Sequence, residues 1–222
     1  MSSIILSEEI NEKFSLPPPV QNLYNFSRDH WSFLTQAVST LDQADKSRPV
    51  KRYPSKDYLY YITNKIVKEA TCAIVKHRRM IVTWSCCSIA LWDAMFNEGR
   101  FVAMISKKEE DSDELVGRCK FIYDNIPDEL LPFKPKMVYK YTEIKFPEID
   151  SVIKGFAQGP DQLRQYTCSR IFADECAFWP QARQTFVAMK PTLEGGGKIC
   201  LFSTRFPGFF QKLIEDTLDD ND

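Results

Sequence analysis

Short apolar runs that alternate with helix-length segments constrain this chain more than any other feature of its sequence. The runs have the length of buried strands, and they occupy Cys72–Val75, Phe101–Ser106, Arg170–Ala173 and Lys198–Phe202. One segment with a helical pattern precedes the first run, at Tyr58–Glu69, and three others separate the runs, at Thr83–Phe96, Glu109–Pro127 and Pro180–Lys190. This alternation predicts an α/β fold with a mainly parallel sheet and helices on both faces.

Two further segments complete the expected fold. Apolar residues on one helical face predict an amphipathic helix over Ser27–Leu41. Alternating residues over Tyr139–Ile149 predict a strand with one exposed face, with Val152–Phe156 as its partner. We expect a helical extension over residues 1–50, the α/β core over 51–210, and an acidic tail or the start of a linker over 211–222.

Composition excludes several classes of protein. The chain has 222 residues, of which 44% are hydrophobic and 27% charged, as in ordinary globular proteins. A net charge of −1 gives no overall electrostatic attraction to nucleic acid, so any such contact must be a local patch. No apolar run is long enough to span a membrane, and residues 1–10 do not resemble a signal peptide. Seven cysteines without a Cys-x-x-Cys pair, and two histidines, argue for free thiols and against zinc.

A pair of acids, Asp174 and Glu175, ends the third apolar run. Burying an unpaired carboxylate is costly, so the pair requires either solvent or a partner. A magnesium ion bound by one acid and a reacting water held by the other is the arrangement at a nucleotide-hydrolysing strand. The alternative is a strand that ends in two solvated acids.

The turn after Val75 joins a strand to a helix, which is the frame of a phosphate-binding loop. It offers cations at Lys76, Arg78 and Arg79 and a hydroxyl at Thr83, but Ile81-Val82 replaces the usual Gly-Lys. A basic surface turn is the alternative. Ser203-Thr204 follows the last strand and reaches the same edge of a parallel sheet. Gly195-Gly196-Gly197 precedes a strand, so we interpret it as a turn.

Taken in order, these segments resemble the ATPase domain of the large terminase subunit, the DNA-packaging motor of tailed bacteriophages. The resemblance runs from about Tyr53 to Phe210. It rests on a segment similar to a divergent Walker A motif, which comprises Lys76, His77, Arg78, Arg79, Met80, Ile81, Val82, Thr83 and Trp84. It rests also on Ala90-Leu91-Trp92, Ser106-Lys107-Lys108, Gly159–Arg164, the Walker B-like Ile171–Trp179 and the coupling motif-like Phe202-Ser203-Thr204. The implied fold is P-loop NTPase-like, of the ASCE or RecA-like type.

The resemblance implies a role for each site residue in binding ATP and Mg²⁺. Lys76 contacts the terminal phosphates, and Arg79 senses the γ-phosphate or contacts a neighbour. Thr83 and Asp174 hold the metal, and Glu175 activates the attacking water. Ser203 and Thr204 sense the state of the γ-phosphate, and Arg164 is a candidate arginine finger for the neighbouring subunit. The family contacts adenine in the region of Tyr53, Pro54 and Tyr58.

Two of these roles, and a possible DNA contact, have simpler alternatives. Arg164 can be a loop arginine bound to a local acid, and Tyr53, Pro54 and Tyr58 can be packing residues. Lys134, Lys136, Lys140 and Lys145 could contact DNA phosphate, although a solvated basic face is the simpler interpretation.

The resemblance also implies partners and a location. These are double-stranded DNA, a portal protein, a small terminase subunit and further copies of the chain in a pentameric ring, in the cytoplasm of an infected bacterial host and transiently at the procapsid portal. The family has a C-terminal nuclease domain, which we do not expect within this chain. Two other hypotheses stay open, a hydrolysis-deficient P-loop scaffold for DNA or partner binding and a helicase-like ATPase.

Overall fold

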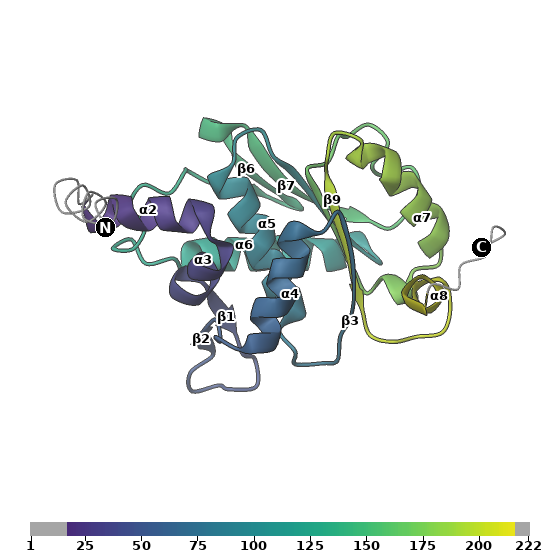
Figure 1. The fold of residues 1–222 in the computed structure, drawn as a ribbon, viewed down its shortest axis with the longest axis horizontal. Coiled ribbons are helices and arrows are strands. Elements are labelled where there is room, and N and C mark those ends of the chain that lie inside the picture. Colours follow the sequence, from purple (N-terminus) through teal and green to yellow (C-terminus); the bar gives the residue numbers. More distant parts are fainter. Residues whose placement is uncertain (1–16, 216–222) are drawn as a thin grey trace, which may run out of the picture.

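A seven-stranded sheet forms the centre of the molecule (Figure 1). The computed structural model describes residues 17–215. The strands are β3 (Thr71–Val75), β4 (Phe101–Ser106), β5 (Val138–Lys140), β6 (Glu143–Phe146), β7 (Ser151–Ala157), β8 (Arg170–Asp174) and β9 (Lys198–Ser203). Their order is β3-β9-β8-β4-β7-β6-β5. The first five strands pair in parallel, and β6 and β5 are added by antiparallel pairing, which confirms the mainly parallel α/β fold.

Helices cover both faces of this sheet, as the sequence predicts (Figure 1). On one face lie α2 (Pro18–Arg28), α3 (His30–Ala37), α4 (Asp57–Lys68), α5 (Val82–Phe96) and α6 (Glu109–Asp124). On the other lie α7 (Ala182–Met189) and α8 (Phe209–Glu215). Three short 3₁₀ helices are η1 (Pro147–Ile149), η2 (Cys176–Phe178) and η3 (Lys190–Leu193).

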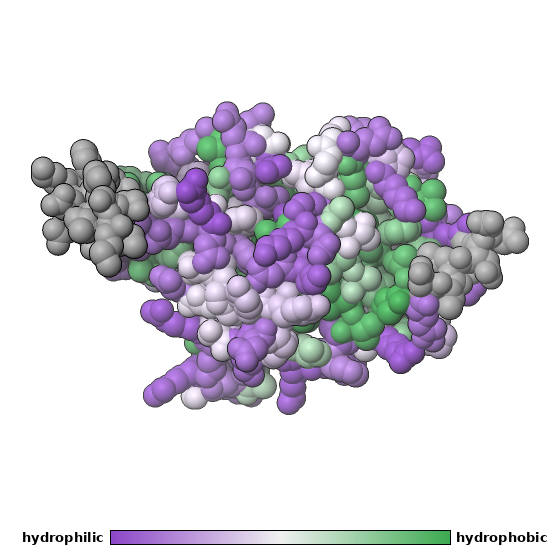
Figure 2. Space-filling model, in the orientation of Figure 1, coloured by the Kyte–Doolittle hydropathy of each residue, from purple (hydrophilic) through white to green (hydrophobic). Residues whose placement is uncertain are grey.

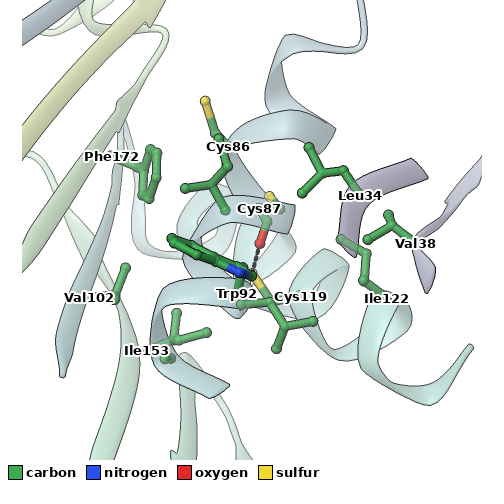
Figure 3. Close-up of a cluster of buried hydrophobic side chains, with 14 of the residues drawn as sticks. Leu34, Val38, Cys86, Cys87, Trp92, Val102, Cys119, Ile122, Ile153 and Phe172 are labelled. Carbon is green, nitrogen blue, oxygen red and sulfur yellow. Dashed lines mark hydrogen bonds between the residues drawn. The ribbon is translucent and has the colours of Figure 1, made fainter. Parts of the chain in front are cut away.

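Two hydrophobic cores form because successive strand residues point to opposite faces of the sheet. In β8, Phe172 packs under the α5 side, while Ile171 and Ala173 pack under the α7 side. Figure 3 shows Phe172 and Trp92 in the larger core, among side chains from α5, α6 and the strands. Every residue of β8 before Asp174 is buried, so the first acid of the pair stands at the edge of the packed interior.

The prediction of one helix over Ser27–Leu41 is wrong. The chain breaks at Asp29, whose carboxylate accepts hydrogen bonds from the backbone N–H groups of Trp31 and Ser32 at 3.0 and 3.2 Å. Such capping starts a new helix, α3. Beyond it, β1 (Ser39–Leu41) pairs with β2 (Val50–Arg52) in a small antiparallel ribbon. The sequence alone does not predict this ribbon, because the residues between the two strands are polar and show no strand pattern.

The predicted single strand over Tyr139–Ile149 is also wrong. A turn at Thr142, with φ 55°, divides it into β5 and β6, and η1 takes up its end. The predicted partner is correct, since β7 pairs with β6. Of the basic residues in this region, Lys134 pairs with Asp128 at 3.2 Å and Lys145 with Glu143 at 3.1 Å.

The ends of the predicted domains fall partly outside the described residues. These are residues 1–16 of the helical extension and 216–222 of the acidic tail. The glycine segment 195–197 connects η3 to β9, as predicted for a turn. Between residues 17 and 215, no helix is long and apolar enough to cross a membrane.

An apolar surface lies at the β3 edge of the sheet, toward α8 (Figure 2). The exposed side chains Val75, Phe206 and Ile214 line a hollow of about 290 Å³ there. The rest of the face shown in Figure 2 is mainly hydrophilic.

Candidate nucleotide site

Parallel pairing brings three of the predicted segments together at one edge of the sheet. Strand β9 lies between β3 and β8, with Val75 opposite Ser203 and Asp174 opposite Phe202. The residues that follow these strands therefore share the carboxyl edge, where ligands bind in open α/β sheets. Lys76, Glu175 and Thr204 meet there although nearly 130 residues separate the first from the last.

Lys76 is the centre of the site. Its ammonium Nζ lies 2.7 Å from Glu175 Oε1 and 3.3 Å from Asp174 Oδ1. It also donates a hydrogen bond to Thr83 Oγ1 at 3.4 Å. The side chain is only 12% exposed, so these contacts balance the charge of a largely buried cation.

Glu175 is fixed by the residues of the predicted coupling motif. Its Oε2 atom accepts hydrogen bonds from Ser203 Oγ at 3.0 Å and from the Thr204 backbone N–H at 3.1 Å. The Thr204 hydroxyl donates to the same atom at 3.2 Å. The Glu175 backbone has φ 49°, a left-handed conformation that is uncommon outside glycine. Such strained backbone often occurs at functional sites. Ser203 and Thr204 thus position the carboxylate directly.

The two acids have opposite protonation tendencies. Burial raises the pKa of Asp174 above its usual value, against the opposing charge of Lys76. Burial acts in the same direction on Glu175, but hydrogen bonds from Lys76 and Thr204 outweigh it and lower that pKa. Burial disfavours the Lys76 ammonium, yet the two carboxylates raise its pKa overall. Glu175 is therefore held as a carboxylate beside a protonated lysine.

The oxygen atoms present fit a magnesium ion. Asp174 Oδ1 is buried and accepts no hydrogen bond of good geometry, so one lone pair in the interior lacks a donor. Within residues 17–215 no cluster of three or more His, Cys, Asp or Glu side chains could hold a metal. Magnesium sites in nucleotide-binding proteins use one or two protein oxygens, water and the phosphates. Asp174 and Thr83 are suitable for that role.

The loop between β3 and α5 keeps the backbone of a tight turn without its usual glycines. Arg79 has φ 69° and Ile81 φ 61°, and a β-branched residue in that region is a genuine outlier. No side chain caps the start of α5, so its first backbone N–H groups remain available to an anion.

Two cavities adjoin the site. The first, about 580 Å³, lies between this loop and the β1–β2 ribbon. Its basic lining residues are Lys51, Arg52, Lys56, Lys76, His77, Arg78, Arg79 and Arg118, and its one lining acid is Asp42. The second, about 510 Å³, contains Asp174, Glu175 and Thr204. Arg78 and Arg118 line both cavities, which places cations at their junction.

The structure brings the whole Walker A-like segment to the first cavity, from Lys76 to Trp84. Two other predicted residues lie elsewhere. Arg164 forms an ion pair with Asp161 at 3.2 Å and lines a separate hollow beside α7, so in this chain it binds the local acid. Tyr53 is 3% exposed, and its hydroxyl lies 2.6 Å from Ser85 Oγ inside the core.

Burial therefore argues against adenine contact by Tyr53 and favours the packing alternative. Pro54 does line the first cavity. Tyr58 donates a hydrogen bond to the Met80 carbonyl at 3.4 Å.

Sequence reasoning missed Arg118 as a site residue. It lies in α6, between the inward-facing Leu115 and Cys119 of that helix, and no motif marks it. Helix α6 follows β4, and β4 pairs with β8, so its position beside the acids was a usable signal. Lys107, which the sequence marks only as part of the Ser106-Lys107-Lys108 motif, lines the second cavity.

A mainly parallel sheet with a lysine and two carboxylates at its carboxyl edge defines the P-loop NTPase-like fold class. The sequence matches no protein-family model. The fold matches that of the large terminase ATPase domain of Thermus phage P74-26, with a TM-score of 0.53 and 14% identity over 72% of this chain and 69% of that one.

Two large terminases give similar matches. The HK97 bacteriophage large terminase has a TM-score of 0.62 at 9% identity, over 81% of this chain and 38% of its own. A large terminase from a thermophilic bacteriophage, solved in complex with ADP, has a TM-score of 0.51 at 14% identity, over 74% of this chain and 44% of its own. The chain therefore has the fold of these ATPase domains, and the predicted resemblance is confirmed for the fold.

Proposed function

We propose that this chain hydrolyses ATP in a magnesium-dependent reaction, as the ATPase domain of a terminase-type DNA-packaging motor. The observation that carries the proposal is the cluster of Lys76, Thr83, Asp174 and Glu175 at the carboxyl edge of the sheet. The ADP complex of a protein with this fold supports a nucleotide as its ligand.

Each side chain has a distinct task in this proposal. Glu175, kept ionised by Lys76 and Thr204, orients a water molecule and accepts its proton. Lys76 and the N–H groups at the start of α5 hold phosphate oxygens. Asp174 and Thr83 would hold Mg²⁺, which supplies charge neutralisation on the phosphates when bound.

The finer parts of the proposal concern the motor. They are translocation of double-stranded DNA into a procapsid, binding to a portal protein and a small terminase subunit, and assembly into a pentameric ring in the host cytoplasm. Arg164, exposed on a loop, is proposed to act on a neighbouring subunit after leaving Asp161. These parts rest on the resemblance of the sequence motifs and on the shared fold.

The test of hydrolysis is phosphate release from ATP by the purified chain at high concentration, with Mg²⁺ and then with excess chelator. We expect Glu175→Gln to abolish turnover while leaving ATP affinity within about threefold of wild type. Asp174→Asn should weaken Mg²⁺ binding, so that turnover requires a higher Mg²⁺ concentration. Glu194→Gln, an exposed acid at the opposite end of β9, is the matched control and should leave turnover unchanged. No turnover by the wild-type chain, even with DNA and portal protein present, would reject the catalytic proposal.

A second candidate is a P-loop scaffold that binds without hydrolysis. The strained Ile81 and the absent Gly-Lys pair favour it, since both reduce the adaptability of the phosphate loop. This candidate predicts nucleotide binding that magnesium does not change. Comparing ATP affinity with and without Mg²⁺ therefore separates the two functions.

A further inference from the structure

Arg118 stands where the two cavities meet. It is one of two residues that line both the basic cavity beside the phosphate loop and the cavity that contains Asp174 and Glu175. Its side chain is 33% exposed, so the charge is accessible from solvent. A phosphate chain that runs from the loop toward the acids passes this position.

The guanidinium is positioned by an aromatic ring and keeps its donors free. Arg118 Cζ lies 5.7 Å from the ring centroid of Trp84, within the range of a cation–π contact. Trp84 itself packs edge-on against Phe121 of α6, at 5.6 Å. The nearest carboxylate, Glu114, is 3.9 Å away, and within the described part of the chain the guanidinium makes no hydrogen bond. The cation–π contact thus holds the group while its planar N–H donors remain available to an oxyanion.

A cation beside the acids suits the charge of a bound triphosphate. Lys76 is shared between two carboxylates, so these three side chains together carry a net negative charge. A triphosphate adds several more negative charges, and the loop has Ile81-Val82 where a lysine would precede Thr83.

We propose that Arg118 binds phosphate oxygens of a nucleoside triphosphate within the same chain, and that it makes the site prefer the triphosphate to the diphosphate. The inference rests on the proposed nucleotide binding and adds a residue from outside the motifs. Arg118 supplies from α6 the cation that the loop lacks beside Thr83.

The test compares dissociation constants for ATP and ADP, measured by titration calorimetry with Mg²⁺ present. We expect Arg118→Ala to weaken ATP binding about tenfold and ADP binding less than about threefold, since charged hydrogen bonds to the terminal phosphate are lost. Arg118→Lys should fall between wild type and alanine. Lys120→Ala, which removes an exposed cation paired with Asp124 on the same helix, should change neither constant.

Two results would overturn the inference. Arg118→Ala is compared with wild type at equal folded fraction. An equal loss of affinity for ATP and ADP, or no loss for either, would show that the arginine serves only to pack α6 against Trp84. If the alanine variant does not fold, Arg118→Gln against Arg118→Lys gives the same comparison. If wild-type protein binds no ATP, the proposed function itself fails, which is a different outcome from wild-type binding that Arg118 does not influence.

Discussion

At the scale of single residues, the ionisation of Glu175 makes the free energy of unfolding depend on pH. Its folded pKa lies below the ordinary value of 4.5, because hydrogen bonds from Lys76 and Thr204 outweigh the effect of burial. The stabilising contribution is therefore present above pH 4.5 and is lost as the pH falls through the lower, folded pKa. We expect Glu175→Gln to reduce the free energy of unfolding at neutral pH by about 1 kcal/mol, after allowing for solvent screening of a side chain that is 34% exposed.

Urea denaturation of both proteins at a series of pH values between about 7 and 3 measures this difference. The two proteins should converge in acid, since protonated Glu175 and glutamine are then both neutral. A gap that is equally large at every pH would show that shape, and not charge, sets the cost. Glu194→Gln is the control for removing an acid that has no role in the site.

At the scale of elements, the sequence predicted those parts whose signal is local. The runs at β3, β4, β8 and β9 carry continuous apolar residues, and α5 carries a long one, so burial alone identifies them. The break at Asp29 depends on a cap that competes with a continuous helical pattern, and β1–β2 depends on pairing between polar residues. The site residues also divide into those with a local sequence signal and those placed by tertiary pairing. Lys76, Asp174 and Glu175 belong to motifs, whereas Arg118 matters only because β4 and β8 pair.

The glycine turn before β9, Gly195-Gly196-Gly197, has a composition similar to that of a phosphate-binding loop. Substitution at Gly197 tests whether the turn is purely structural. A Cβ atom at Gly197 would lie 2.2 Å from the Cys168 carbonyl oxygen and 2.7 Å from Leu193 Cδ2. We expect Gly197→Ala to lower the free energy of unfolding by about 2–3 kcal/mol, because backbone atoms must move. Nucleotide affinity should not change, since the turn lies at the opposite end of β9 from Ser203.

Gly195→Ala is the matched control for this turn. The nearest atom to its Cβ would be Thr167 Cγ2 at 3.9 Å, an ordinary contact. Chemical denaturation of both variants should separate them clearly. A loss of nucleotide affinity in the Gly197 variant, at unchanged folded fraction, would contradict the interpretation of this segment as a structural turn.

At the scale of the whole molecule, β8 carries ionised groups at both ends and uses them differently. At its start, Arg170 is 5% exposed, pairs with Asp93 of α5 at 3.4 Å and donates to the Ile66 carbonyl of α4 at 2.7 Å. This buried pair joins the sheet to the helices that cover one face. At its other end, Asp174 Oδ1 is buried and has the Lys76 ammonium at 3.3 Å but accepts no hydrogen bond of good geometry. The Arg170–Asp93 pair has its partners within the fold, whereas Asp174 lies beside a cavity with an oxygen that can still accept from a ligand.

Removing one partner of the buried pair therefore tests stability apart from the site. We expect Asp93→Ala to lower the free energy of unfolding by about 3–5 kcal/mol, because Arg170 keeps its charge in the interior without a carboxylate. The double variant Asp93→Leu with Arg170→Met removes both charges and should recover most of that loss. Urea denaturation measures the stability, and ATP affinity at equal folded fraction measures the site. A double variant as unstable as Asp93→Ala would show that packing around Asp93, and not the stranded charge, holds α5 to the sheet.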